Sequence, residues 1–409
     1  MKYLMIILLF LGWNFSFANT IKVGPNEKYK TIKSAIAAAN DHDVLQVKKG
    51  VYEEYDIEIK KPLTIEGEEG VIVDGMRKGQ IFHIMSDSVT LRRMLVKSVG
   101  MSYTNDWAAI RVTNSQHFVL EDLTIRESYF GIYLARSNYG KVLNNDIVGE
   151  TRIEYNSGNG IHLWYSKHIE IVGNRISGGR DGIYFEFADN CSIRDNVSIN
   201  NIRYGLHFMF SNDDEYIGNT FENNGTGVAV MFSRRILMEN NTFRKNWGPS
   251  AYGLLVKEIY DAEITNNVFE ENTIGLQVEG SSRINYFDNN FIRNGWALKF
   301  SGAAYTNNFK RNNFLNNSFD MSYNSHLNDN LFDGNYWSDY TGYDLDKDGY
   351  GDIPYRPVKL FAYVVERAPE SIILLRSLFI DIINFSEKVS PVFTPDNLMD
   401  NKPKMKPYK

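Results

Sequence analysis

The chain has 409 residues, a formal net charge of −6 and 43% hydrophobic residues, which is enough to bury a large core. The negative charge offers no basic surface, so nucleic acid is excluded as a partner class. Cys191 is the only cysteine, so no intramolecular disulfide can form. Packing and hydrogen bonds must therefore hold the fold together.

Residues 1–18, "MKYLMIILLFLGWNFSFA", have the pattern of a cleaved secretory signal peptide. Lys2 precedes an apolar run, and Ser16 and Ala18 form an A-x-A-like cleavage site. We therefore expect an exported protein whose mature chain starts near Asn19. No later stretch approaches the roughly 18 to 20 uninterrupted apolar residues of a membrane span.

The first expected element of the mature chain is a helix at about residues 31–40, "TIKSAIAAAN". Its apolar residues Ile32, Ala35, Ile36 and Ala39 have helical spacing. A repeat protein must cover the unpaired strand edges and apolar core of its end units. The spacing therefore predicts an N-terminal cap helix.

An internal repeat follows, with units that start 22 to 29 residues apart. The units open at Gly131, Gly160, Gly182, Gly205, Gly227, Gly253 and Gly275. Counted from the glycine, positions 2 and 4 are apolar, as in a strand with one buried face. Position 15 is asparagine in every unit: Asn145, Asn174, Asn196, Asn219, Asn241, Asn267 and Asn289. Stacked coils allow such amides to bond to their copies above and below. We therefore predict an all-β, right-handed parallel β-helix of the pectin-lyase-like type over residues 19–355.

Positions 3 and 5 of the repeat, whose side chains are expected to point outward, carry the candidate metal ligands. Stacking should make Met209 and Met231 vertical neighbours, with His207 two residues from Met209 on the same strand face. Thioether and imidazole are ligands suited to Cu(I). Two other interpretations stay open: a docking patch for a protein partner without metal, and an incidental surface.

An acidic loop follows the repeats. "DLDKDGYGD" places Asp344, Asp346, Asp348 and Asp352 at the spacing of the first part of a calcium loop, with a glycine at position 6. Position 12 is Tyr355, so the usual bidentate glutamate is missing. The alternatives are a structural calcium site and an Asp/Gly-rich turn.

Residues 356–409 are expected to form a C-terminal docking segment and tail. The stretch Glu370 to Val389 is apolar but interrupted by Arg376 and Asp381, which disfavours a spanning helix. It can dock on a partner or a membrane surface, or fold back onto the β-helix. The final "MDNKPKMKPYK" indicates an extended, flexible tail.

The rival function is carbohydrate chemistry, because solenoids of this kind commonly carry polysaccharide lyases, hydrolases and epimerases. Asp213 and Asp214 could mimic a carboxylate pair, and Trp164 and Tyr184 could stack on sugars. Adjacent residues usually diverge, however, and no G-H-G, R-I-K or D-P-H-E stretch is present. We assign no catalytic residue and expect the protein not to be an enzyme.

The sequence resembles the NosD family over nearly the whole mature chain. The resemblance is carried by "YKTIKSAIAAA", "GRDGIYFEFADNCSIRDN", "RYGLHFMFSNDDEYIGN", "GVAVMFSRRILMENN" and "GNYWSDYTGYDLDKDGYGDIPY". It implies a non-enzymatic periplasmic partner of an ABC transporter with a NosY-like membrane subunit and a NosF-like ATPase. It also implies transient Cu(I) handover from a NosL-like chaperone in the maturation of nitrous oxide reductase. The membrane would be reached only through the transporter.

The resemblance also implies roles for particular residues. His207, Met209 and Met231, with His162 and Glu186 nearby, would form the copper relay or the chaperone dock. Trp164 and Tyr184 would contribute to docking on the solenoid face. The transporter subunit would be held by the segment Ser371 to Ile383, through Leu375, Leu378, Phe379 and Ile382.

Overall fold

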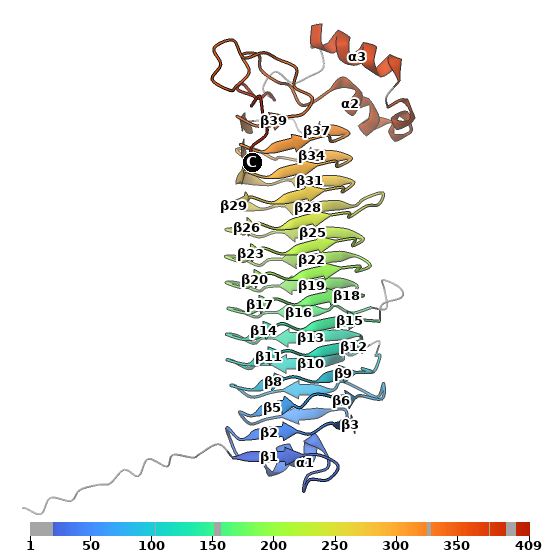
Figure 1. The fold of residues 1–409 in the computed structure, drawn as a ribbon, viewed down its shortest axis with the longest axis vertical. Helices are drawn as coiled ribbons and strands as arrows, with labels where there is room; N and C mark the ends of the chain where they lie inside the picture. The colour runs from blue at the N-terminus through green and yellow to red at the C-terminus, as the bar shows by residue number, and fades with distance from the viewer. Residues whose placement is uncertain (1–18, 103, 151–156, 325–328, 376, 390–397) are drawn as a thin grey trace, which may run out of the picture.

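The computed structural model describes residues 19–102, 104–150, 157–324, 329–375, 377–389 and 398–409. Three parallel sheets wind as stacked coils into one long solenoid (Figure 1). Helix α1 (Ile32–Ala38) lies at one end, and helices α2 (Leu360–Arg367) and α3 (Leu378–Val389) lie at the other. The predicted parallel β-helix is confirmed. The expected signal peptide, residues 1–18, lies outside the described residues.

Each sheet collects one strand from successive coils, and all strand pairs within it are parallel. Sheet A has 14 strands: β1 (Thr20–Val23), β2 (Val44–Val47), β5 (Thr64–Gly67), β8 (Thr90–Arg92), β11 (Val119–Glu121), β14 (Lys141–Leu143), β17 (Glu170–Val172), β20 (Ser192–Arg194), β23 (Glu215–Ile217), β26 (Leu237–Glu239), β29 (Tyr260–Thr265), β32 (Ser282–Phe287), β35 (Asn308–Lys310) and β38 (Leu331–Asp333). Sheet B has 13: β3 (Gly50–Glu53), β6 (Val71–Asp74), β9 (Leu95–Lys97), β12 (Thr124–Ser128), β15 (Asp146–Gly149), β18 (Arg175–Ser177), β21 (Val197–Ile199), β24 (Thr220–Glu222), β27 (Thr242–Arg244), β30 (Val268–Glu270), β33 (Asn290–Ile292), β36 (Asn313–Leu315) and β39 (Tyr336–Trp337).

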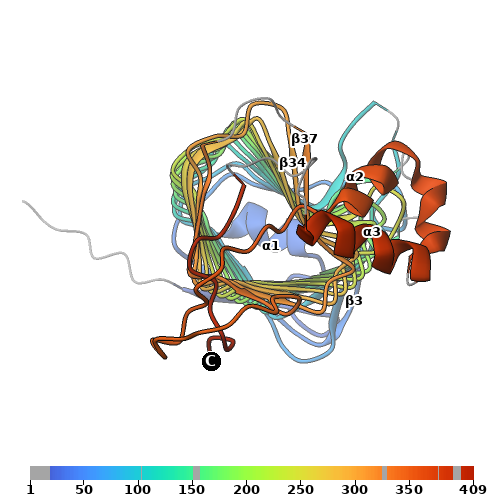
Figure 2. The ribbon, with the colours of Figure 1, turned by 90° about the horizontal axis from the view of Figure 1, so that it is seen from above.

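Sheet C, which carries the candidate site, has 12 strands: β4 (Ile57–Ile59), β7 (Phe82–Ile84), β10 (Ala108–Thr113), β13 (Phe130–Ala135), β16 (Ile161–Trp164), β19 (Asp181–Glu186), β22 (Tyr204–Met209), β25 (Thr226–Met231), β28 (Tyr252–Lys257), β31 (Ile274–Glu279), β34 (Trp296–Ser301) and β37 (Phe319–Asn324). Seen along the solenoid axis, the coils superpose closely (Figure 2). Equivalent side chains of neighbouring coils therefore form columns.

The asparagine column at position 15 is the clearest of these. The Oδ1 atom of Asn219 accepts hydrogen bonds from both the backbone N and the Nδ2 of Asn196 at 3.0 Å. The Nδ2 atom of Asn196 also donates to the carbonyl of Ile171 at 2.8 Å. The same pattern runs through every coil from Asn145 to Asn335, and these amides are almost fully buried. Each amide therefore satisfies buried polar groups in two coils, which confirms the predicted ladder.

The N-terminal cap is also confirmed. In helix α1, the side chains of Ile32, Ala35 and Ile36 are buried against the first coils. Glu54 lies at the start of the helix, and its two oxygens accept the backbone N–H groups of Ile32 and Lys33 at 2.6 and 3.0 Å. These bonds satisfy donors that have no partner within a helix. The short helix therefore covers the open end, and Glu54 satisfies two of its free N–H groups.

At the other end the asparagine ladder finishes on Asp400. One carboxylate oxygen accepts the backbone N and the Nδ2 of Asn335 and the Nε1 of Trp337 at 2.9 to 3.1 Å, and the other accepts Gly334 N. Asp400 and Leu398 are fully buried. The prediction of a flexible tail at residues 399–409 is therefore wrong, because the carboxylate of Asp400 takes the place of the next asparagine in the ladder.

A second buried carboxylate, Asp320, lies where the glycine column ends. At the glycines of this column a Cβ would collide with the next coil; at Gly205 it would lie 2.9 Å from the carbonyl oxygen of Gly227. The position is taken by Ala297 in β34 and by Asp320 in β37. Among the described residues no strand of sheet C follows β37, so the side chain of Asp320 meets no further strand there. Its Oδ2 accepts the hydroxyl of Tyr355 at 2.7 Å. Burial raises the pKa of Asp320 to about 6.

The C-terminal helices fold back on the edge of the solenoid. Phe361, Ala362 and Val365 of α2 and Ile380 of α3 pack against Trp296 and Phe319 of sheet C. In the end-on view α2 and α3 project beyond the outline of the coils (Figure 2). None of the described helices combines the length and apolarity that crossing a bilayer requires. Packing on the solenoid therefore buries the apolar side chains on only one side of this segment.

The ladder's end predicts a local effect of replacing Asp400. Asp400→Ala removes the acceptor of four N–H groups in the last coil. We expect the last coils to lose about 2 to 4 kcal/mol of local stability, because buried donors without partners are costly and coils contact only their neighbours. Hydrogen exchange should accelerate in residues 307–337 and stay unchanged in residues 44–97. Asp333→Ala is the control, because the side chain of Asp333 forms an exposed ion pair with Lys310, which contributes little to stability.

Asp320 predicts a pH dependence of stability. Its folded-state pKa of about 6 lies above the ordinary 3.8, so between these values the folded state keeps a proton that the unfolded chain releases. The stabilising contribution is complete below 3.8 and is lost as the pH rises through about 6, a difference of up to about 3 kcal/mol. In urea unfolding, Asp320→Asn should match the unsubstituted protein near pH 4 and exceed its stability at pH 8. Equal stabilities at both pH values would contradict this assignment.

Candidate functional site

The candidate site lies on the outer side of sheet C. In β22, Leu206 and Phe208 point into the core and are fully buried, so His207 and Met209 point outward. Met209 pairs directly with Met231 of β25, and His207 pairs with Ala229. The predicted placement of the two methionines on adjacent coils is therefore confirmed.

His207 is less accessible than the alternation predicts. Its side chain points outward from the strand but is only 3% exposed. The Tyr204 ring lies 4.7 Å from the imidazole, and the Tyr184 ring meets it edge-on at 5.2 Å. The neighbouring outward residue, Ala229, is fully buried as well. The expectation of an exposed histidine is wrong, because tyrosines from two coils cover it, whereas Met209 and Met231 are only partly buried.

Buried polar atoms surround His207. Its Nδ1 lies 3.8 Å from Oδ2 of Asp181, which is fully buried. Among the described residues, neither ring nitrogen of His207 has a hydrogen-bond partner, and neither does that carboxylate oxygen. Both nitrogens therefore retain their capacity to bind. His207 and Met209 share the outward face of β22, and Met231 pairs with Met209 on the next coil, so the three offer an imidazole and two thioethers, donors that suit Cu(I).

His162 belongs to a ring stack instead. It lies between Tyr133 and Tyr184, with ring centroids 4.4 and 4.7 Å away, and Tyr184 separates it from His207. The Nδ2 of Asn159 lies 3.0 Å from Nδ1 of His162. Burial, assisted by two nearby arginine side chains, lowers the pKa of His162 to about 3. The ring is therefore neutral near pH 7 and lies two coils from His207.

Glu186 and Trp164 share the column of the methionines. Glu186 pairs with Met209 on one side and with Trp164 on the other. It accepts a hydrogen bond from the Tyr184 hydroxyl at 3.3 Å, and burial together with this carboxylate raises the pKa of Tyr184 to about 12. Trp164 is partly exposed beneath the guanidinium of Arg136 at 5.0 Å. Tyr184 is 9% exposed, so it offers little docking surface.

A column of exposed aromatic residues borders the site and was missed in the sequence. Its members are Tyr165, Phe187, Phe210 and Phe232, which we call the corner column. Their rings stack at 4.6 to 5.2 Å, and three of them are 41 to 47% exposed. All four have φ near +50°, which costs about 1 kcal/mol per residue and is offset in part by ring stacking. The sequence signal is the aromatic sixth letter of four consecutive units.

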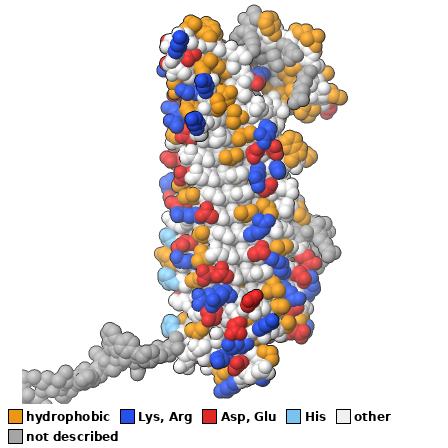
Figure 3. Space-filling model, viewed as in Figure 1, with side chains coloured by type: hydrophobic (Ala, Val, Ile, Leu, Met, Phe, Trp, Pro, Cys, Tyr) orange, Lys and Arg blue, Asp and Glu red, His pale blue; other side chains and the backbone are white. Residues whose placement is uncertain are grey.

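The predicted docking residues of the C-terminal segment divide between two sides. Leu375 is partly buried against the cluster formed with Trp296, so less of its side chain is open to a partner, and its docking role stays a prediction. Leu378, Phe379 and Ile382 are 74%, 58% and 58% exposed. Hydrophobic side chains gather on this end of the molecule (Figure 3). Helix α3 therefore presents apolar side chains on both its packed and its open side.

The acidic loop brings three of its four aspartates together. The carboxylates of Asp344, Asp346 and Asp348 lie within 4.8 Å of one another. Asp352 is outside this group, and its Oδ2 accepts the backbone N of Leu345 at 2.7 Å. Asp344 also accepts the N–H of Gly349 at 3.0 Å, as in an ordinary acidic turn. Calcium binding stays a prediction.

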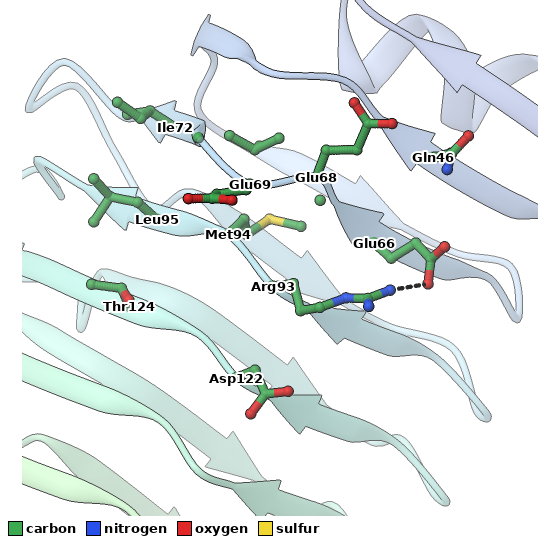
Figure 4. A pocket seen from close by; sticks show the side chains of 13 residues that line it. Gln46, Glu66, Glu68, Glu69, Ile72, Arg93, Met94, Leu95, Asp122 and Thr124 are labelled. Atoms are coloured by element: carbon green, nitrogen blue, oxygen red, sulfur yellow. Dashed lines mark hydrogen bonds and ion pairs between the residues drawn. The ribbon is translucent and has the colours of Figure 1, made fainter.

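A groove of about 740 Å³ lies near the N-terminal end, away from the candidate site (Figure 4). Acidic side chains line it, including Glu66, Glu68 and Asp122, and Arg93 forms an ion pair with Glu66 at 2.8 Å. None of the predicted ligand residues takes part in its lining. The groove therefore adds nothing to the metal site.

Asp213 and Asp214 do not form a carboxylate pair. Asp213 forms an exposed ion pair with Arg235 at 2.5 Å. Asp214 is buried in the core, where it accepts the backbone N of Cys191 at 2.7 Å, and burial raises its pKa well above the ordinary value. The expectation that these neighbours diverge is confirmed.

Comparisons with known sequences match this chain to proteins described as NosD. A family model described as "Periplasmic copper-binding protein (NosD)" matches residues 143–342. The chain is similar to the "Probable ABC transporter binding protein NosD" of Pseudomonas aeruginosa, with 28% identity over 403 residues and 85% of each chain covered. It is also similar to the protein of the same description from Stutzerimonas stutzeri, with 26% identity over 368 residues, 85% of this chain and 84% of that one.

Among solved structures, the Dettilon tailspike protein has a similar fold, with a TM-score of 0.59 and 14% identity. The match covers 75% of this chain and 68% of that one. Other solved structures of this fold include carbohydrate-cleaving enzymes. At such identities the likeness shows the fold alone.

Proposed function

The chain belongs to the NosD family of periplasmic copper-binding proteins, and on that premise we propose that it is the periplasmic component of an ABC transporter complex that receives Cu(I) and supports metal-site assembly in nitrous oxide reductase. The observation that carries the proposal is the pairing of Met209 with Met231, two residues along the strand from His207, whose buried ring nitrogens have no hydrogen-bond partner among the described residues. Two soft sulfurs and one nitrogen favour Cu(I) over harder cations.

The arrangement suits a cargo that must leave again. Met209 and Met231 are partly exposed, so a second protein can reach their sulfur atoms. His207 is covered by tyrosines and supplies nitrogen from below the surface. Glu186 lies next to Met209 and adds a negative charge near the bound cation. His162 is two coils away from His207 and takes the role of a stacking residue in this proposal.

Docking of a NosL-like copper chaperone fits the face beside the methionines. Trp164 and the corner column present exposed aromatic surface over four consecutive coils. Aromatic residues and methionine are enriched in protein interfaces. A rigid solenoid keeps this surface in a fixed relation to the copper ligands. The chaperone would therefore meet an open apolar patch directly next to the acceptor sulfurs.

Attachment to the transporter is assigned to helix α3. Its exposed Leu378, Phe379 and Ile382 form an apolar surface outside the solenoid. A NosY-like membrane subunit would cover this surface, and a NosF-like ATPase would supply the energy. The chain contains no Gly-rich phosphate loop of its own. The membrane is thus reached through the partner subunit.

A non-enzymatic role is supported by the acidic residues on the candidate face. The pair considered for glycoside chemistry, Asp213 and Asp214, is divided between a surface ion pair and the core. Two carboxyl groups that flank one bond must face a common cleft. The proposal therefore assigns the protein to cargo handling.

The copper ligands can be tested by anaerobic Cu(I) competition titration of residues 19–409. The double variant Met209→Ala with Met231→Ala should bind Cu(I) at least about tenfold more weakly, because two soft ligands are removed, and tenfold corresponds to about 1.4 kcal/mol. Adding His207→Ala should weaken binding further. Met101→Ala is the control, because this methionine is 52% exposed but far from His207 in the sequence and in the coils. An affinity unchanged in the triple variant would remove the copper site.

The transporter contact can be tested with Phe379→Asp combined with Ile382→Asp. Both side chains are 58% exposed, so the thermal unfolding midpoint should stay the same. Affinity for the detergent-solubilised membrane subunit should fall at least about 30-fold, as expected when an apolar anchor worth about 2 kcal/mol is lost. Val51→Asp, at a 62% exposed position near the opposite end, is the matched control. Undiminished binding of the double variant would rule out α3 as the attachment site.

A further inference from the structure

Four buried polar atoms without hydrogen-bond partners gather around Asp181. Among the described residues, these are Oδ2 of Asp181, Nδ1 and Nε2 of His207, and Nε of Arg180. Asp181 is fully buried, and His207 is 3% exposed. A buried polar group without a partner costs about 1 to 3 kcal/mol, so a native fold keeps such a group only for a reason. Their concentration at one point of sheet C requires a specific explanation.

The carboxylate of Asp181 is held in a fixed orientation. Its Oδ1 accepts the backbone N–H of Tyr204 at 3.3 Å. Its own backbone N–H donates to Oδ1 of Asn159 at 3.3 Å. The second oxygen, Oδ2, is left facing His207 Nδ1 at 3.8 Å and Arg180 Nη2 at 3.7 Å. Two donors therefore converge on an oxygen that has room for both.

The imidazole is held as firmly as the carboxylate. The ring of Tyr204 lies 4.7 Å from it at a tilt of 48°, and the ring of Tyr184 lies 5.2 Å away at 78°. These rings prevent a large rotation of His207. A shift of less than 1 Å is enough to bring Nδ1 within the 2.7 to 3.2 Å of an N–H···O hydrogen bond.

We propose that Asp181 is the positioning residue of the copper site: its Oδ2 accepts the Nδ1–H of His207 and thereby leaves Nε2 unprotonated as the nitrogen donor for Cu(I). This inference rests on the proposed function, since it assigns a role to His207 as a ligand. A histidine that ligates a metal commonly donates its other N–H to a carboxylate, which fixes the tautomer and the ring orientation. Arg180 Nη2 forms an ion pair with the same carboxylate oxygen at 3.7 Å.

The variant Asp181→Asn distinguishes positioning from mere packing. The amide keeps the shape of the side chain, and its oxygen can still accept the Tyr204 N–H. Its NH₂ group then takes the place of Oδ2 and donates to Nδ1, which forces the proton onto Nε2. In the Nε2–H tautomer the Nε2 atom has no lone pair for copper, and the lone pair of Nδ1 accepts the hydrogen bond from the amide. A carboxylate with no function beyond filling space would produce no such change of tautomer.

The experiment combines NMR and titration on residues 19–409. Long-range ¹H–¹⁵N spectra of ¹⁵N-histidine-labelled protein, assigned with His207→Ala, should show the Nδ1–H tautomer without copper and the Nε2–H tautomer in Asp181→Asn. The Cu(I) affinity of Asp181→Asn should fall about 10- to 100-fold. Asp320→Asn is the matched control, because it neutralises another buried carboxylate and should change neither the tautomer nor the affinity.

The outcomes separate the two proposals. An Nε2–H tautomer in the unsubstituted protein, or a tautomer that does not change in Asp181→Asn, overturns the role of Asp181. A tautomer change without any loss of Cu(I) affinity in Asp181→Asn or His207→Ala overturns the ligand role of His207 and leaves the positioning of the ring supported. If Asp181→Asn does not fold, the tautomer of the unsubstituted protein decides alone.

Discussion

The hydrogen bonds between asparagine side chains of successive coils are the constraint on which this structure depends. Each amide oxygen accepts two N–H groups from the coil before it, and each amide nitrogen donates to the next amide and to a backbone carbonyl. A slip of one residue in any coil would break these bonds and turn every side chain of a strand to the opposite face. The ladder therefore fixes which residues become neighbours on the surface.

Register alone does not decide what the surface offers to a partner. The same strand that presents Met209 at the surface presents His207 beneath two tyrosine rings. Columns set the separation between residues at about 4.8 Å per coil, whereas the side chains around each column decide access. The register therefore places His207, Met209 and Met231 on one face, and the surrounding side chains bury the nitrogen of His207 but leave the two sulfur atoms near the surface.

Features that repeat with the coil could be predicted from the sequence, because they depend on local spacing. The strands, the asparagine ladder and the pairing of Met209 with Met231 belong to this group. The cap helix does not repeat, but the helical spacing of its apolar residues is also local. The burial of His207 could not be predicted, because Tyr204 precedes its unit's glycine and Tyr184 belongs to another coil. The role of Asp400 carries no periodic signal, since this carboxylate accepts the N–H groups of Asn335 from 65 residues further along the chain, where a further asparagine would otherwise follow in the ladder. The partial burial of Leu375 depends on where the short 3-10 helix Pro369–Leu374 ends and α3 begins.

Under the proposed function, the distance between the copper ligands and the transporter-binding helix α3 limits how copper is released. Five coil-to-coil steps in sheet C separate β22 from β37, where α2 packs, which corresponds to about 24 Å. The continuous ladder and the stacked core between them resist bending or twisting of single coils. Movement of a transporter subunit bound to α3 would therefore displace the whole solenoid as a rigid body and leave the geometry around His207 unchanged. Copper must then be released by a partner protein that competes for it at the exposed sulfur atoms of Met209 and Met231. This explains why the two sulfur atoms lie near the surface, whereas the nitrogen of His207 lies below it.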